Sequence, residues 1–164
     1  TPNLRPASKA SRRVSLSSAA FAEVEVDDET GEVTVERYVA VHDAGVLINP
    51  MIAEAQVVGG LVQGIGGGML EELVYGDDGQ LLTSNLADYV LPTAVETPPI
   101  MVVHTETPSP LNPLGVKGLG EGGAIAPPVA IANAVCDALK PLKTEINATP
   151  VRPADIVREF LKGD

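Results

Sequence analysis

One glycine-rich loop carries the charged side chains that are best placed to do chemistry. Residues 115–123 read Gly-Val-Lys-Gly-Leu-Gly-Glu-Gly-Gly, and their only charged side chains are those of Lys117 and Glu121. Glycine lets a backbone pass close to a ligand, and a carboxylate that leads into an apolar segment is costly to bury unless it has chemistry to do. We therefore treat Glu121 as a candidate functional residue. The alternative is an ordinary flexible loop with a solvated glutamate.

The same loop also matches the dinucleotide-binding pattern G-x-G-x-x-G, through Gly118, Gly120 and Gly123. That pattern requires a strand directly before the loop. The approach to this loop contains three prolines between residues 108 and 113, which a central strand does not accommodate. Nucleotide binding is therefore the weaker interpretation of the loop.

A second set of polar side chains lies on a predicted glycine-rich helix. Asn49-Pro50 is typical of a helix start, and helical periodicity continues over residues 51–73. Gln56 and Gln63 are seven residues apart, so they share one face of this helix. Because the helix contains six glycines, we expect close approach to another backbone or to a bulky ligand. The alternative for the two glutamines is a pair of core amides bonded to nearby loops.

The elements that must position these residues predict an α+β fold. The expected order is an N-terminal β-hairpin, the glycine-rich helix, mixed short strands, and the loop followed by C-terminal helices. The predicted ranges are a hairpin at 22–27 and 32–42, short strands at 81–82 and 100–107, and helices at 126–139 and 156–161. A helix that begins just after Gly123 directs its positive end toward the loop.

Two further residue types offer chemistry but have simpler interpretations. His42 and Asp43 are adjacent at the end of the second hairpin strand, and His104 is the only other histidine. This is too few ligands for a metal site, so we expect His42 to be satisfied by local hydrogen bonds. Cys136 is the only cysteine, which excludes a disulfide within the chain, and we expect it to be a buried small hydrophobe.

Two segments, taken together, resemble the molybdenum hydroxylase family, which contains xanthine dehydrogenase, aldehyde oxidase and the carbon monoxide dehydrogenase large subunit. The first segment is Ala-Gln-Val-Val-Gly-Gly-Leu-Val-Gln-Gly-Ile-Gly at 55–66, and the second is the loop at 115–123 followed by Ala-Ile-Ala-Pro. The resemblance is to the C-terminal part of the molybdopterin-binding subunit and extends from Phe21 to Leu161. Ala55 stands where the family often has glycine. Glu-Gly-Gly at 121–123 replaces the Glu-Pro-Pro of xanthine dehydrogenases and favours the carbon monoxide dehydrogenase branch.

The resemblance implies a molybdenum-containing oxidoreductase that hydroxylates a carbon centre with oxygen from water. The substrate classes it allows are an aldehyde, a purine-like N-heterocycle or carbon monoxide. The implied cofactor is molybdopterin, in the cytosine dinucleotide form as one alternative, whose pterin holds the metal, so no protein metal ligand is expected. The implied catalytic residue is Glu121, and the implied cofactor contacts are Gln56, Lys117, Gly118, Leu119 and Gly120. For Lys117, a local ion pair is the alternative.

The resemblance also implies a chain that acts within an assembly and is inactive alone. We expect residues 1–18 to form a flexible N-terminal arm and residues 19–164 to form the C-terminal molybdopterin-binding domain, as a fragment or a separate subunit. The expected partners are the remainder of the molybdopterin-binding subunit, iron–sulfur and flavin (FAD) subunits, and a small-molecule substrate, in a hetero-oligomer. The alternative function is a non-catalytic cofactor-handling or scaffold module of the same fold.

Composition argues against several other classes of protein. The net charge of −11 disfavours nucleic acid and anionic membranes as partners. Because the sequence contains no apolar run of about 18 residues, no membrane span is expected. No apolar segment follows Ser11-Arg12-Arg13, so the sequence does not support export, and we expect a cytoplasmic location.

Overall fold

The computed structural model describes residues 16–162 of the chain. Three strands form one sheet in the order β1-β2-β3, with β1 antiparallel and β3 parallel to the central strand β2. The strands are β1 (Ser17–Val26), β2 (Val33–Asp43) and β3 (Ile100–Thr105). The helices are α1 (Pro50–Met69), α2 (Pro127–Ala138), the short 3₁₀ helix η1 (Lys140–Leu142) and α3 (Pro153–Lys162). The α+β fold class is thus confirmed.

The N-terminal hairpin is longer than the sequence predicted. β1 begins at Ser17, so the last two residues of the arm predicted at 1–18 belong to the sheet. Residues 1–15 of that arm lie outside the described range. At the other end of the hairpin, Asp27 accepts hydrogen bonds from the backbone N–H groups of Glu29 and Thr30, which closes the turn.

A β-bulge keeps the apolar side of β2 facing inward along its whole length. Glu23 pairs with Arg37 whereas the next residue, Val24, pairs with Val35, so Glu36 is an extra residue on β2. A single extra residue reverses the alternation of side chains in a strand. The buried positions accordingly change phase at this point, and they are Val33, Val35, Tyr38, Ala40 and His42.

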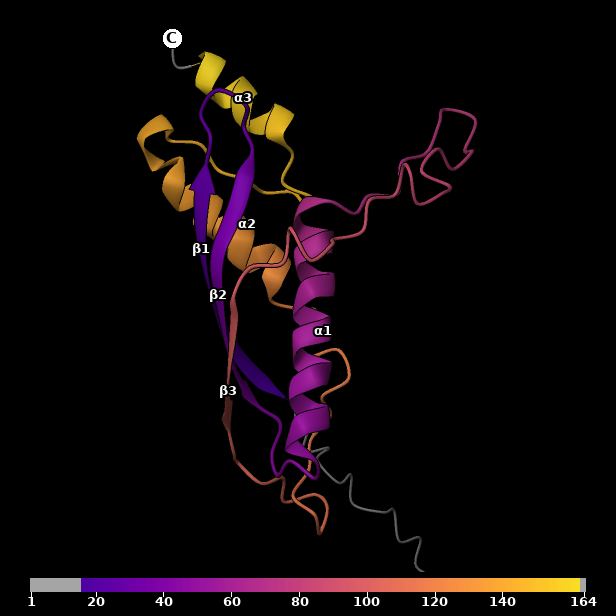
Figure 1. Ribbon diagram of the computed structural model, residues 1–164, viewed down its shortest axis with the longest axis vertical. Coiled ribbons are helices and arrows are strands. Elements are labelled where there is room, and N and C mark those ends of the chain that lie inside the picture. The colour runs from indigo at the N-terminus through magenta and orange to yellow at the C-terminus, as the bar shows by residue number, and fades with distance from the viewer. Residues whose placement is uncertain (1–15, 163–164) are drawn as a thin grey trace, which may run out of the picture.

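α1 and α2 cover the same face of the sheet, and α3 packs near the turn that joins β1 to β2 (Figure 1). Ile65 of α1 and Ile131 of α2 both join Val35 in one buried cluster. Val57 and Leu61 of α1 form a second cluster with Tyr38 at the other end of the sheet. The core therefore lies between one sheet face and two helices.

Three glycines on one side of α1 allow the segment after the glycine loop to approach its backbone. A β-carbon at Gly60 would lie 3.0 Å from the α-carbon of Gly123, and one at Gly64 would lie 2.7 Å from the carbonyl oxygen of Ala124. At Gly68 it would lie 3.1 Å from the α-carbon of Pro128. This glycine seam, formed by Gly60, Gly64 and Gly68 against residues 123–128, confirms the expected close approach of two backbones.

The chain between α1 and β3 leaves the body of the protein as an extended arm (Figure 1). The strand predicted at 81–82 is wrong, because this region forms only a single bridge between Tyr75 and Leu81. The base of the arm is fastened by a 2.5 Å hydrogen bond from the Tyr89 hydroxyl to Glu71 and by an ion pair between Glu72 and Arg152. Between residues 16 and 162, no helix has both the length and the apolar content needed to cross a membrane.

Candidate functional site

The glycine-rich loop starts beside the end of β2, where several backbone contacts fix its path. The N–H group of Lys117 donates to the carbonyl oxygen of Ala44 at 2.9 Å, and that of Val46 donates to Gly115 at 3.1 Å. The Asn112 side chain donates to the carbonyl oxygen of Val116 at 2.9 Å and accepts from its N–H group at 3.1 Å. The first half of the loop is therefore held rigidly against the sheet.

The Lys117 side chain turns toward the sheet and forms an ion pair with Asp43. Its ammonium nitrogen lies 2.9 Å from Asp43 Oδ1, and the two side chains are only 7% and 14% exposed. The same oxygen accepts hydrogen bonds from the N–H groups of Gly45 at 3.0 Å and Thr107 at 3.1 Å. Hydrogen bonds from Thr107 and Lys117 hold the pKa of Asp43 well below its usual range. The side chain of Lys117 forms the local ion pair that was the alternative interpretation, and its N–H group is bonded to Ala44. Only its carbonyl oxygen remains for the predicted cofactor contact.

His42 differs from the sequence expectation. It is 1% exposed, and within residues 16–162 neither of its ring nitrogens has a hydrogen-bond partner. His104 lies opposite it on β3, and its ring nitrogens are also buried without a partner among these residues. Burial, with a smaller effect from the charge on His104, lowers the pKa of His42. The expectation of a histidine satisfied by local hydrogen bonds is therefore wrong.

Gln56 connects α1 to the second half of the loop. Its side-chain nitrogen donates to the carbonyl oxygen of Gly120 at 2.5 Å, across 64 residues of sequence. Gln63 lies seven residues later on the same face of α1, and both glutamines border one depression in the surface. Gln63 makes no hydrogen bond to another described residue. Both glutamines are exposed, so neither is the core amide that the alternative interpretation required.

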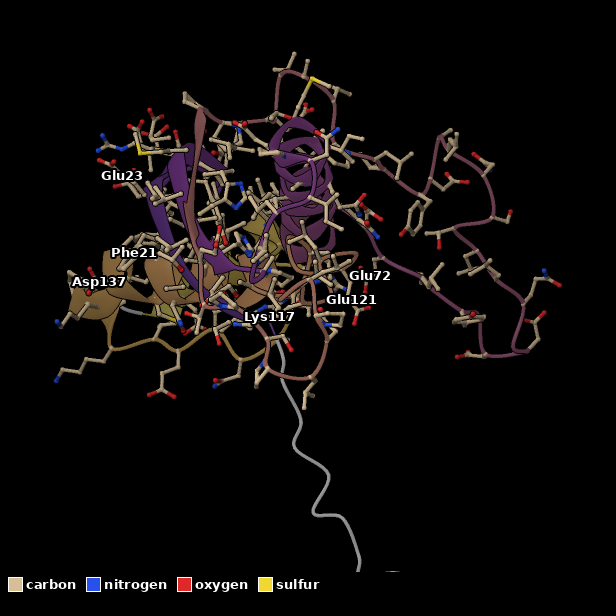
Figure 2. The ribbon with its side chains drawn as sticks, turned by 90° about the horizontal axis from the view of Figure 1, so that it is seen from below. Phe21, Glu23, Glu72, Lys117, Glu121 and Asp137 are labelled. Atoms are coloured by element: carbon tan, nitrogen blue, oxygen red, sulfur yellow. The ribbon has the colours of Figure 1, made fainter. Side chains whose placement is uncertain are left out.

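Glu121 is exposed and lies between two depressions in the surface; it is labelled with Lys117 in Figure 2. One depression of about 390 Å³ is shared with Gln56 and Gly59 of α1. The other, of about 610 Å³, is bounded by residues 118–122 together with Leu16 and Ile125. A carboxylate at this position reaches both spaces, which suits a group that accepts a proton from a bound molecule.

The residues at this site fit a cofactor that is held through backbone and amide groups. Within the described part of the chain, the backbone N–H groups of residues 118–121 donate to no other residue. Gly59 has no atom within 4 Å of where its β-carbon would lie, so the wall of the 390 Å³ depression is open there. Across residues 16–162, no cluster of three or more His, Cys, Asp or Glu side chains is arranged to hold a metal ion directly. The N–H groups of residues 118–121 and the open wall at Gly59 suit a pterin ligand held through backbone hydrogen bonds.

The structure places Gln56 beside Gly120 and Glu121, whereas the side chain of Lys117 lies against Asp43. Sequence reasoning missed the residues that support the loop. Asp43 and Asn112 fix the first half of the loop, and neither was assigned a role. A local signal was available for Asp43, because an aspartate two residues before a glycine often closes a turn through its side chain. Gly45 has the positive φ of 66° that such a turn favours.

Taken together, the fold and the site define an α+β domain in which a glycine-rich helix and a glycine-rich loop border one surface depression. Comparison with known proteins agrees with this description. A family model described as the molybdopterin cofactor-binding domain matches residues 5–98. The chain therefore belongs to the molybdopterin cofactor-binding domain family of the molybdenum hydroxylases.

Individual relatives are much longer than this chain. The nicotine 6-hydroxylase large subunit of Paenarthrobacter nicotinovorans is 47% identical over 135 residues, which are 82% of this chain and 16% of the relative. The carbon monoxide dehydrogenase large chain of Hydrogenophaga pseudoflava is 44% identical over 115 residues, 70% of this chain and 14% of the relative. The crystal structure of quinoline 2-oxidoreductase from Pseudomonas putida 86 matches with a TM-score of 0.81 and 46% identity, covering 85% of this chain and 18% of that one. The chain thus spans about a sixth of the length of these relatives.

Proposed function

We propose that this chain supplies the catalytic base and part of the cofactor site of a molybdenum-dependent hydroxylase acting on an N-heteroaromatic ring. The observation that carries the proposal is the position of Glu121, which borders both depressions and follows the residue that Gln56 holds. The substrate class is supported by two similar proteins whose names contain nicotine and quinoline, at 47% and 46% identity. Both of these molecules contain a nitrogen heteroaromatic ring.

The molybdenum cofactor, when bound, supplies the oxygen-transfer and electron-accepting chemistry. Glu121 accepts, at its carboxylate, the proton released by the water that provides the oxygen. Gln56 fixes the carbonyl group of Gly120 and so sets the position of the next residue, Glu121. The N–H groups of residues 118–121, which donate to no other described residue, would hold the cofactor. The ion pair of Lys117 with Asp43 keeps the start of the loop in place.

The proposed enzyme also contains parts that lie outside this chain. The proposal includes the remainder of the molybdopterin-binding subunit and iron–sulfur and flavin subunits that carry the electrons away. The length of the relatives supports the remainder of the subunit, because this chain corresponds to only 14–18% of each of the three. The words large subunit in the name of the nicotine 6-hydroxylase relative support further subunits. A cytoplasmic location is the part of the proposal that rests on the sequence alone.

The decisive experiment replaces the proposed base in the native enzyme. We expect Glu121→Gln to lower turnover by about 10²- to 10⁴-fold, the usual contribution of general-base catalysis, while molybdenum content stays unchanged. The matched control is Glu54→Gln, which makes the same change at an exposed position of α1. Full turnover by Glu121→Gln would show that the base is assigned to the wrong residue.

The substrate class needs a separate measurement. We expect the wild-type enzyme to hydroxylate a pyridine or quinoline ring and to oxidise carbon monoxide and simple aldehydes at least tenfold more slowly. A preference for carbon monoxide would reject the N-heteroaromatic class and leave the role of Glu121 intact. Molybdenum binding without turnover of any of these substrates would instead favour the non-catalytic cofactor-handling module.

A further inference from the structure

The face of the sheet that points away from the helices carries two apolar rows at one end. Strand pairing places Phe21, Val39 and Met101 side by side in one row. The neighbouring row contains Ala19, Val41 and Val103. Phe21 is 65% exposed, Met101 58% and Val103 42%. Figure 2 shows Phe21 on the side of the strands opposite α1. We call these six residues the outer apolar patch.

The other end of the same face is polar. Glu25 on β1 and Thr34 on β2 are paired and exposed there, and the glutamate of the bulge, Glu36, lies beside them. An ion pair of 2.6 Å between Arg37 and Glu23 marks the border between the two halves. The face of a sheet that is exposed to water normally carries polar side chains along its whole length. The polar half follows this rule and the outer apolar patch does not.

The outer apolar patch lies at the end of the sheet that supports the site. Beyond Val41, β2 ends at Asp43, which holds Lys117 and with it the start of the glycine-rich loop. The depressions around Glu121 also open at this end of the molecule. A covering layer on the patch therefore adjoins the strand end that supports the loop, whereas the depressions around Glu121 lie on the helix side of the sheet.

We propose that the outer apolar patch is the docking surface for the remainder of the molybdopterin-binding subunit. This inference rests on the proposed function, because that function requires the rest of the subunit. About five-sixths of the length of each relative lies outside the matched region, so most of such a subunit has to be packed around this domain. The patch stops at the Glu23–Arg37 ion pair, which places the boundary of the covered area there.

The test uses photo-crosslinking in the native holoenzyme. The photoreactive analogue p-benzoylphenylalanine replaces Phe21, and the matched control carries it at Glu25, on the same strand and the same face but in the polar half. We expect position 21 to crosslink to a peptide of the molybdopterin-binding subunit outside residues 1–164, at least tenfold more than position 25 does. Equal yields at the two positions would overturn the proposal. A crosslinked peptide from residues 1–164 of a second copy would also overturn it.

Two single-cysteine variants provide an independent test if the bulky photoreactive side chain disturbs the fold. In the native holoenzyme, we expect Phe21→Cys to react with a maleimide at least tenfold more slowly than Glu25→Cys, as located by peptide mass spectrometry. Equal labelling rates contradict the docking surface. Activity of Glu121→Gln, measured separately, distinguishes the two proposals: the docking surface stands if position 21 is protected even where Glu121→Gln retains full turnover.

Discussion

The side-chain nitrogen of Gln56 lies 2.5 Å from the carbonyl oxygen of Gly120 and so ties the middle of α1 to the residue before Glu121. We expect Gln56→Ala to lower kcat/KM by about 2- to 13-fold, because one neutral hydrogen bond contributes about 0.5–1.5 kcal/mol. The matched control is Gln63→Ala, which removes an amide from the same depression without breaking a hydrogen bond. Steady-state kinetics checks this, and equal effects of the two substitutions would contradict a specific role for Gln56.

The glycine seam predicts opposite effects for two alanine substitutions on α1. Gly64→Ala places a β-carbon 2.7 Å from both the Ala124 carbonyl oxygen and Pro127, so we expect a loss of about 1–3 kcal/mol in the free energy of unfolding. Gly67→Ala meets no atom within 4 Å, so we expect a gain of about 0.5–1 kcal/mol from higher helix propensity. Denaturant unfolding measures both changes. A gain for Gly64→Ala would show that the seam is not closely packed.

The lowered pKa of Asp43 predicts how its contribution to stability changes with pH. Since the folded state binds the proton more weakly than the unfolded state, the stabilisation is complete above the unfolded pKa of about 3.9. It decreases only as pH falls below that value toward the lower folded pKa. We expect the difference in unfolding free energy between wild type and Asp43→Asn to be constant from about pH 8 to 5 and to shrink below about pH 4. Denaturant titrations across this range check it, and a pH-independent difference would reject the assignment.

The buried His42 predicts a second pH dependence at higher pH. Its folded pKa is lowered by burial and by the charge of His104, whereas the unfolded imidazole titrates near its ordinary value of about 6.5. The unfolded state therefore gains a proton first, and the free energy of unfolding falls as pH drops from about 6.5 through the folded pKa. We expect His42→Leu to flatten this fall. Unfolding measured at about pH 7.5 and 5 tests the expectation, which fails if the variant keeps the wild-type slope.

The sequence predicted the elements whose signals are local. Asn49 caps α1 by accepting a hydrogen bond from Ile52, as the Asn-Pro pair indicated. The helix ends at Met69, earlier than the periodicity predicted, because the N–H groups of Leu70 and Glu71 both bond to the carbonyl oxygen of Gly66. After α1 the chain enters the extended arm, which makes few contacts with the body (Figure 1). The apolar residues there therefore form neither the predicted end of the helix nor the strand predicted at 81–82.

The bulge had a signal that was not used. The alternating pattern of β2 contains two adjacent polar residues, Glu36 and Arg37, and this doubling marks the extra residue. For the site, sequence pattern and resemblance identified Gln56 and the loop, but they did not predict the hydrogen bond between them. That contact spans 64 residues, and the Asp43–Lys117 ion pair spans 74. Such pairs are set by the parallel placement of β3 and the path of the loop, which no local pattern encodes.

The absence of side chains along one edge of α1 has a consequence for how a ligand is received. Because the backbones of Gly60 and Gly123 are in direct contact, α1 and the segment after the glycine-rich loop are too closely packed to slide or rotate past each other. The conformational entropy of aligning Gln56 with Glu121 is therefore lost when the chain folds, so ligand binding does not include this entropy loss. A ligand therefore meets this part of its site already arranged, and the exposed side chains around it are what has to adjust.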